Sequence, residues 1–145
     1  MVTRIIDGSE KDKAMRLCDS AFPLPICDKE NYAEIFKKID QYAEFLVVYQ
    51  DGDIAGYAAM YNNDLNSRTA YISMLGVREE YQGKHIGSQL MKACKENAQK
   101  KGMKAVRLEV FDSNKKAIGF YEKAGFEFEK RCSENSIYMI HRFPD

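Results

Sequence analysis

The segment YQGKHIGSQLM, residues 81–91, runs from a loop into a helix whose apolar residues recur at every fourth position. It places glycines at 83 and 87, although glycine is costly inside regular structure and needs a reason there. One reason is turn geometry and packing. The other is anion binding, because the first turn of a helix has unpaired N–H groups and a positive dipole end that glycine leaves accessible. The spacing matches neither GxxxxGK[ST] nor GxGxxG, which excludes the common nucleotide-binding loops.

The composition is that of an ordinary folded protein with a balanced surface. The chain has 145 residues, 45% hydrophobic and 30% charged, with 22 basic and 22 acidic side chains. We expect residues 1–145 to form one domain. Balanced charge gives no general attraction for nucleic acid or anionic membranes, and no stretch approaches the ~20 apolar residues of a spanning helix. The first residues turn charged at once, without a signal-peptide apolar region, so the cytoplasm is the expected compartment.

The cysteines give no sign of a metal site. Cys18, Cys27, Cys94 and Cys132 form no CxxC pair, and the chain has only 2 histidines. We therefore expect no metal, and free buried thiols.

Hydrophobic periodicity and turn residues predict elements in the order β-α-α-β-β-β-α-β-α-β-β. Ser9 and Asp28 are expected to cap the first two helices, and Asp51-Gly52 to form a hairpin turn. Strands that come in a run and then alternate with helices predict an α/β fold with a mixed sheet and helices on both faces. The expected strands are 2–7, 44–50, 54–62, 69–77, 104–111, 126–132 and 136–143, and the expected helices are 9–21, a second one after residue 28, a third ending near 101, and 115–125.

Three further features follow in a fixed order: LEV at 108–110, Asn114, and FYEKAGF at 120–126. Together with residues 82–87 they resemble the GCN5-related N-acetyltransferase (GNAT) family. That family's cofactor segment reads [Q/R]-x-x-G-x-[G/A], and here it is QGKHIG. The resemblance covers the whole chain in element order and residues 69–126 in motif. His85 stands where the family prefers glycine, but histidine tolerates a positive φ better than most residues.

The resemblance implies a GNAT fold: a central mixed, mostly antiparallel sheet of six to seven strands with about four helices. It also implies acetyl-CoA as the donor, with its diphosphate on the segment Gln82, Gly83, Lys84, His85, Ile86, Gly87 and Ser88. The pantetheine arm would pair with Leu75, Gly76 and Val77 as an added strand, and a main-chain N–H there would polarise the thioester carbonyl. Gly76 fits a bulge or close ligand approach, or is a plain sheet glycine.

Two side chains are implied to carry the chemistry. Glu109 would be the base that deprotonates the amine, unless it is a solvated strand residue paired with a lysine; Glu79 and Glu80 are reserve candidates. Alternation of Val106, Leu108 and Val110 places Glu109 on the opposite face of its strand. Tyr121 would be the acid that protonates the leaving thiolate, unless it is a core aromatic residue. Asn114 would bind the cofactor arm, or simply cap the helix that follows.

The acceptor groove of the family is lined by residues that match 20–34 and 131–138. Phe22, Leu24, Ile26 and Tyr32 are the expected acceptor-binding residues, flanked by acidic side chains. An apolar wall with acidic flanks suits a cationic amine with some apolar surface, such as a peptide N-terminus, a lysine, an amino sugar or a polyamine. We expect an N-acetyltransferase, monomeric or homodimeric, with a small-molecule or peptide acceptor. The alternatives are a non-catalytic acyl-CoA-binding domain and a generic nucleotide-binding domain.

Overall fold

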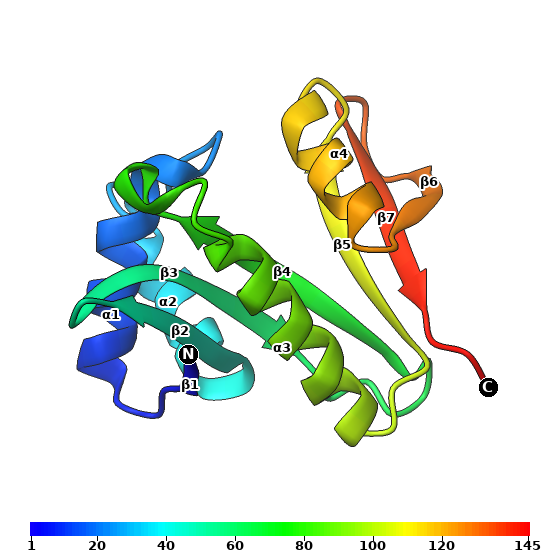
Figure 1. The fold of residues 1–145 in the computed structure, drawn as a ribbon, viewed down its shortest axis with the longest axis horizontal. Coiled ribbons are helices and arrows are strands. Elements are labelled where there is room, and N and C mark those ends of the chain that lie inside the picture. The colour runs from blue at the N-terminus through cyan, green and yellow to red at the C-terminus, as the bar shows by residue number, and fades with distance from the viewer.

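The computed structural model describes residues 1–145 and contains one seven-stranded mixed sheet in the order β1-β2-β3-β4-β5-β7-β6 (Figure 1). All neighbouring strands are antiparallel except β4 and β5, which are parallel. The predicted order of elements is confirmed, and so is a central mixed, mostly antiparallel sheet of six to seven strands with about four helices. The strands are β1 (Val2–Arg4), β2 (Glu44–Gln50), β3 (Asp53–Tyr61), β4 (Thr69–Val77), β5 (Ala105–Phe111), β6 (Glu127–Arg131) and β7 (Ser136–Arg142). The α-helices are α1 (Gly8–Cys18), α2 (Tyr32–Tyr42), α3 (Ile86–Lys100) and α4 (Lys115–Lys123), and the short 3-10 turns are η1 (Asp19–Ala21) and η2 (Glu79–Tyr81).

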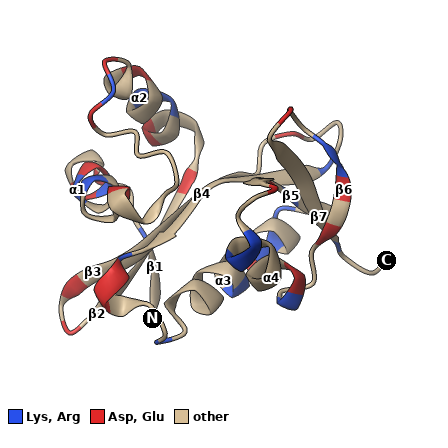
Figure 2. Cartoon of the chain, turned by 90° about the horizontal axis from the view of Figure 1, so that it is seen from above, with Lys and Arg blue, Asp and Glu red and all other residues tan.

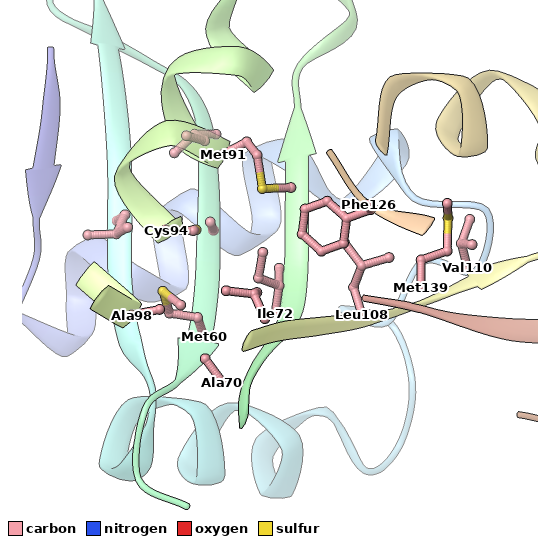
Figure 3. Close-up of a cluster of buried hydrophobic side chains, with 14 of the residues drawn as sticks. Met60, Ala70, Ile72, Met91, Cys94, Ala98, Leu108, Val110, Phe126 and Met139 are labelled. Carbon is pink, nitrogen blue, oxygen red and sulfur yellow. The ribbon is translucent and has the colours of Figure 1, made fainter. Parts of the chain in front are cut away.

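Helices cover both faces of the sheet, as predicted. Figure 2 shows α1 and α2 on one face and α3 and α4 on the other. The larger buried cluster lies on the α3 side, where Met91, Cys94 and Ala98 pack on the sheet (Figure 3). A second cluster packs Met15 and Cys18 of α1 against Tyr57 of β3. None of the helices combines the length and apolarity that crossing a bilayer requires.

The caps of the first two helices differ from the prediction. Asp7, not Ser9, precedes α1 with an extended backbone, and its carboxylate accepts the Ser9 N–H. Asn31, not Asp28, precedes α2, because Lys29 and Tyr32 close two further turns before that helix begins. The predicted turn at Asp51-Gly52 is confirmed by positive φ at both residues, as a two-residue hairpin requires.

β4 and β5 are paired over only four positions, from Thr69↔Ala105 to Ile72↔Leu108. Beyond them the two strands part, and Figure 1 shows them meeting at one end and spreading at the other. The register of β4 against β3 slips at the same level, which leaves Ser73 as an extra residue. A bulge bends a strand, so this one turns β4 away from β5. β4 keeps its pairing with β3, and β5 keeps its pairing with β7, on either side of the gap.

Two glycines allow β3 and β4 to approach closely beside the gap. A Cβ at Gly56 would lie 2.8 Å from the Gly76 carbonyl oxygen and 3.2 Å from Ile86. A Cβ at Gly76 would lie 2.6 Å from the Phe22 ring, so that ring rests on the bare main chain of β4. Gly76 is thus a site of close packing, and the bulge lies at Ser73 instead.

Gly56→Ala should destabilise the fold because its methyl group would meet a main-chain oxygen that cannot move alone. We expect a loss of ~1–3 kcal/mol of unfolding free energy, measured by urea denaturation. Gly119→Ala is the matched control: Gly119 lies inside α4 with nothing within 4 Å of its Cβ position, so alanine should add ~0.5–1 kcal/mol. No loss at Gly56, or an equal loss at Gly119, would contradict the close approach.

Candidate active site

The loop before α3 presents a run of free main-chain N–H groups. Gly83 has φ +83° and His85 has φ +63°, which confirms that histidine takes up the left-handed conformation at this position. No hydrogen bond in the structure uses the N–H groups of residues 83–88. Unpaired donors at a helix start, next to the positive end of the dipole, form an anion-binding site.

A polar network holds this loop in place. The Arg78 guanidinium donates to the Asp53 carboxylate at 3.1 Å and to the Ile54 carbonyl at 3.0 Å, both at the start of β3. The Tyr81 hydroxyl donates to the same Asp53 carboxylate at 3.3 Å. The loop is therefore tied to the β2–β3 hairpin, which leaves its amides free to face outward.

The parted end of β4 offers a second set of unpaired groups. Arg78 N–H donates to the Ala55 carbonyl at 2.8 Å, so alternate residues of β4 turn their peptide groups toward β3. Gly76 belongs to that set, whereas Leu75 and Val77 turn theirs toward the gap. The Val77 carbonyl already accepts the Gln82 side-chain amide at 3.1 Å. Of the three expected residues, Leu75 and Val77 present main-chain N–H groups to the gap, and Gly76 does not.

Two cavities meet at this gap. The first, here called the amide cavity, has a volume of about 400 Å³ and runs along the loop and α4. The expected cofactor-binding residues line it except Lys84, whose ammonium lies over the Tyr81 ring at 5.5 Å. The lining residues among them are Leu75, Gly76, Val77, Gln82, Gly83, His85, Ile86, Gly87, Ser88 and Asn114.

The second cavity, here called the gap cavity, has a volume of about 360 Å³ and lies between the parted strands. Phe22, Leu24 and Ile26 line it as expected, and Glu109 is its only charged residue. Tyr32 does not line it. That ring is buried at 7% exposure and its hydroxyl donates to Asp12 at 2.7 Å, so Tyr32 is a core residue and the expected acceptor contact is corrected.

The expected contribution of residues 131–138 is also absent from the lining of the gap cavity. β4, β5 and α4 form that wall instead. The reserve residues Glu79 and Glu80 line neither cavity, and Glu80 binds Arg78 at 3.0 Å.

Tyr121 lies where the two cavities join and lines both. Its ring packs against Phe120 and Phe126 with centroids 5.5 and 6.0 Å away. Its hydroxyl makes no hydrogen bond. Burial raises the pKa of Tyr121 above its ordinary value, with a smaller contribution from Cys94. The side chain is therefore a packed ring that holds a protonated, unpartnered hydroxyl in the cavity.

Glu109 points away from the buried face of β5, as its alternation with Leu108 and Val110 predicts. Its carboxylate accepts the Ser136 hydroxyl at 2.7 Å from β7 and takes part in no ion pair. Its neighbour Arg107 binds Glu129 instead, at 2.6 and 2.7 Å. Glu109 is exposed, as the alternative of a solvated strand residue predicts, but no lysine pairs with it.

Asn114 caps α4, since its side-chain oxygen accepts the Ala117 N–H at 3.3 Å. It also lines both cavities, and its side-chain nitrogen makes no hydrogen bond. Asn114 therefore caps α4 with its side-chain oxygen and still has a free donor, its side-chain nitrogen, at the cavities.

Several lining residues were not singled out from the sequence. Ala117 and Phe120 follow Asn114 at helical spacing, which could have identified them as part of the same face of α4. Ala21 carried no such signal, because its position depends on the η1 turn.

The sequence matches the Acetyltransferase (GNAT) family over residues 12–126. The chain belongs to the GNAT family. A Bacillus subtilis (strain 168) protein, provisionally named a ribosomal protein bS18-alanine N-acetyltransferase, is 31% identical over 108 residues, which cover 74% of this chain and 68% of that protein. The spermine/spermidine N(1)-acetyltransferase of the same strain is 30% identical over 94 residues, 61% of this chain and 62% of its own length, hence less than two thirds of that relative.

The fold of this GNAT chain is shared with solved members. The PaiA N-acetyltransferase of Thermoplasma acidophilum, solved in complex with coenzyme A, superimposes with a TM-score of 0.74 at 18% identity over 99% of both chains. The parted strands and the loop of free amides thus occur within a complete GNAT fold.

Inorganic pyrophosphate should bind the free amides and raise the melting temperature by ~3 °C at a concentration about tenfold above its dissociation constant. Gly87→Val should abolish that shift, because the Gly87 Cβ position is 3.3 Å from Phe120 and a branched side chain would fill the amide cavity. Differential scanning fluorimetry measures both. Gly119→Val, in α4 and outside both cavities, is the control and should keep the shift. A shift that survives Gly87→Val would place the anion elsewhere.

Proposed function

We propose that this GNAT enzyme transfers the acetyl group of acetyl-CoA directly to a primary amine. The observation that carries the proposal is the continuity of three features. Six free N–H groups at residues 83–88 open onto the parted end of β4, and the path ends at the unpartnered hydroxyl of Tyr121.

The residues present fit the donor. A diphosphate needs several N–H donors converging without side chains in the way, and a Cβ at Gly83 would meet nothing within 4 Å. The pantetheine arm contains amide groups, which match the outward peptide groups of Leu75 and Val77 as an added strand would. When bound, acetyl-CoA supplies a thioester whose carbonyl carbon accepts the amine.

The Leu75 and Val77 N–H groups are suited to stabilise negative charge on the acyl oxygen. Fixed main-chain donors that face a gap need no reorganisation as charge develops. Gly76 serves this arrangement indirectly, because its missing side chain lets Phe22 cover the strand from the acceptor side.

Glu109 and Tyr121 fit the two proton transfers. An alkyl amine such as a lysine side chain has a pKa of ~10 and a peptide N-terminus one of ~8, so both arrive mainly protonated at pH 7. A carboxylate in the gap cavity is the group that removes this proton, directly or through a water molecule. The raised pKa of Tyr121 keeps its hydroxyl protonated and available to the thiolate as it departs.

The residues that line the gap cavity indicate which kind of amine it would accept. Apolar side chains from the α1–α2 connection and from β4 form most of its lining, and Glu109 supplies the single charge. This combination favours an amine attached to an apolar body, such as a peptide N-terminus or a small amine. The names of the two relatives reported above refer to an alanine of a ribosomal protein and to spermine or spermidine, so both are named for the acetylation of amines.

The cysteines favour direct transfer over an acyl-enzyme. Burial raises the pKa of Cys18 and Cys94 to about 12 and that of Cys27 to about 11. None of the four cysteines lines either cavity. Nucleophilic catalysis needs an accessible thiolate, so the amine itself is the attacking group.

Tyr121→Phe should lower kcat by about 100-fold or more and leave the dissociation constant of acetyl-CoA nearly unchanged, because only the hydroxyl is removed and the ring remains packed. Free thiol release with a panel of peptides and amines gives kcat, and calorimetry gives binding. Loss of binding would make Tyr121 structural. A wild-type chain that binds acetyl-CoA but acetylates no amine would instead be a non-catalytic acyl-CoA-binding domain.

Glu109→Gln should lower kcat/KM about 100-fold at pH 7. The defect should shrink as the pH approaches the amine's own pKa of ~10, where the acceptor loses its proton unaided. Glutamine keeps the acceptor oxygen for Ser136, so the fold should be retained. Glu79→Gln removes a carboxylate outside both cavities and should leave the pH–rate profile unaltered. A defect of constant size at all pH values would rule out the role of Glu109 as base.

A further inference from the structure

A chain of two serine hydroxyls leads to Glu109 from the turn between β6 and β7. Ser136, the first residue of β7, lies opposite Phe111 in the register with β5 and is 1% exposed. Its hydroxyl donates to Oε2 of Glu109 at 2.7 Å, and the Ser133 hydroxyl lies 2.7 Å from that of Ser136. Neither serine lines the gap cavity or the amide cavity, so this chain reaches the site only through Glu109.

The hydrogen bonds of this chain can run in only one direction. A hydroxyl has one proton, and Ser136 donates its proton to Glu109 because an ionised carboxylate can only accept. Ser136 therefore accepts the proton of the Ser133 hydroxyl. Ser133 in turn accepts the Asn135 N–H at 3.2 Å. Every donor of the chain thus points toward Glu109, and hydrogen bonds aligned in this way strengthen one another.

The turn that carries Ser133 is tied to the strand that carries Glu109. The Ser133 N–H donates to the Ser136 carbonyl at 3.2 Å, which closes the turn onto the start of β7. The Arg131 guanidinium donates to the Ser133 carbonyl at 3.2 Å and pairs with the Asp112 carboxylate at 2.9 Å. Because Asp112 directly follows β5, the serine chain keeps a fixed position relative to that strand.

Only one oxygen of the Glu109 carboxylate is engaged. Oε2 accepts the Ser136 hydroxyl, whereas no hydrogen bond in the structure uses Oε1. Glu109 is exposed, and an exposed glutamate side chain is free to adopt many rotamers unless a bond selects one of them. A base must lie within hydrogen-bond reach of the proton that it removes. A buried hydroxyl that holds Oε2 therefore leaves Oε1 in a defined place for the amine.

We propose that Ser136 and Ser133 are positioning residues for the acetyl transfer, because their hydroxyls hold Oε2 of Glu109 and leave Oε1 free for the acceptor amine. This inference rests on the proposed function and deepens it. In the step concerned, an N–H bond of the ammonium group breaks and its electron pair stays on nitrogen. The proton passes to Oε1, directly or through a water molecule, and neither serine changes its hydrogen bond. Residues 131–138, which do not line the gap cavity, thus act on the reaction through the base.

Ser136→Ala should lower kcat about tenfold, because it removes a hydrogen bond to a charged group. KM for the amine and the dissociation constant of acetyl-CoA should stay nearly unchanged, since the serine touches neither ligand. Ser133→Ala should lower kcat about threefold, because it weakens the chain one bond further from the base. Ser133→Thr keeps the hydroxyl at an exposed position and should retain the wild-type rate. Free thiol release with an accepted amine measures these rates.

The decisive variants combine each serine substitution with Glu109→Gln. Once the carboxylate is gone, Ser136→Ala and Ser133→Ala should cause no further loss of kcat, because two residues that act through the same group are not additive. Ser67→Ala is the matched control. It removes a hydroxyl that donates to the Asp64 carboxylate at 2.8 Å outside both cavities, and it should leave kcat unchanged.

Serine substitutions that lower kcat by the same factor with and without Glu109 would overturn the inference, since the hydroxyls would then act on the fold rather than on the base. Wild-type rates in both Ser136→Ala and Ser133→Ala would also overturn it while leaving the proposed function intact. Ser133 is exposed, so its variant tests the chain even where the buried Ser136→Ala does not fold. A wild type that acetylates no amine would overturn the proposed function and this inference together.

Discussion

The parting of β4 from β5 is the constraint on which the site depends. Neighbouring strands normally satisfy each other's peptide groups, but here pairing stops after Ile72 and Leu108. Each strand keeps its other neighbour, so the sheet survives the gap. The peptide groups of Leu75 and Val77 therefore face a space rather than a strand, and an extended molecule with its own amides can satisfy them.

The loop before α3 also presents unpaired main-chain N–H groups, outside the sheet. Positive φ at Gly83 and His85 turns the chain so that successive N–H groups remain free, and Arg78 holds the loop to the neighbouring hairpin. In the proposed function, the main chain of this loop therefore binds the diphosphate. Side chains enter only where the path ends, with Tyr121 at the junction of the cavities and Glu109 beyond it.

The sequence predicted the elements well because their signals are local. Asp51-Gly52 marks a tight turn, and Gly102, with φ +78°, stops α3 as expected. Caps were harder to predict, since Asp7 and Ser9 both qualify and only the backbone conformation decides between them. Asp28 failed as a cap because Asp19, nine residues earlier, accepts the N–H groups of Ile26 and Cys27 and shapes the whole connection.

The site residues, like the helices and strands, could be predicted only where their signal is local. Residues that belong to a local pattern, such as the loop 82–88, Asn114 and Tyr121, were predicted. Residues whose role depends on distant partners were not. Tyr32 lies on an apolar helical face, but its burial depends on Asp12 of α1. Ser136 reaches Glu109 only through the register of β5 and β7.

Carboxylates hold the two helices whose connecting segment lines the gap cavity. Asp12 accepts from Tyr32 and Arg16, Glu10 from Tyr49, and Asp40 from Lys11, and these bonds join α1 to α2 and to β2. Burial raises the pKa of Asp12, but the bonds from Tyr32 and Arg16 together outweigh it and leave that pKa lowered. A lowered folded-state pKa contributes stability that is present above the unfolded value and is lost as the pH falls through the folded one. Protonation of Asp12 therefore weakens the link between α1 and α2, the two helices whose connecting segment lines the gap cavity.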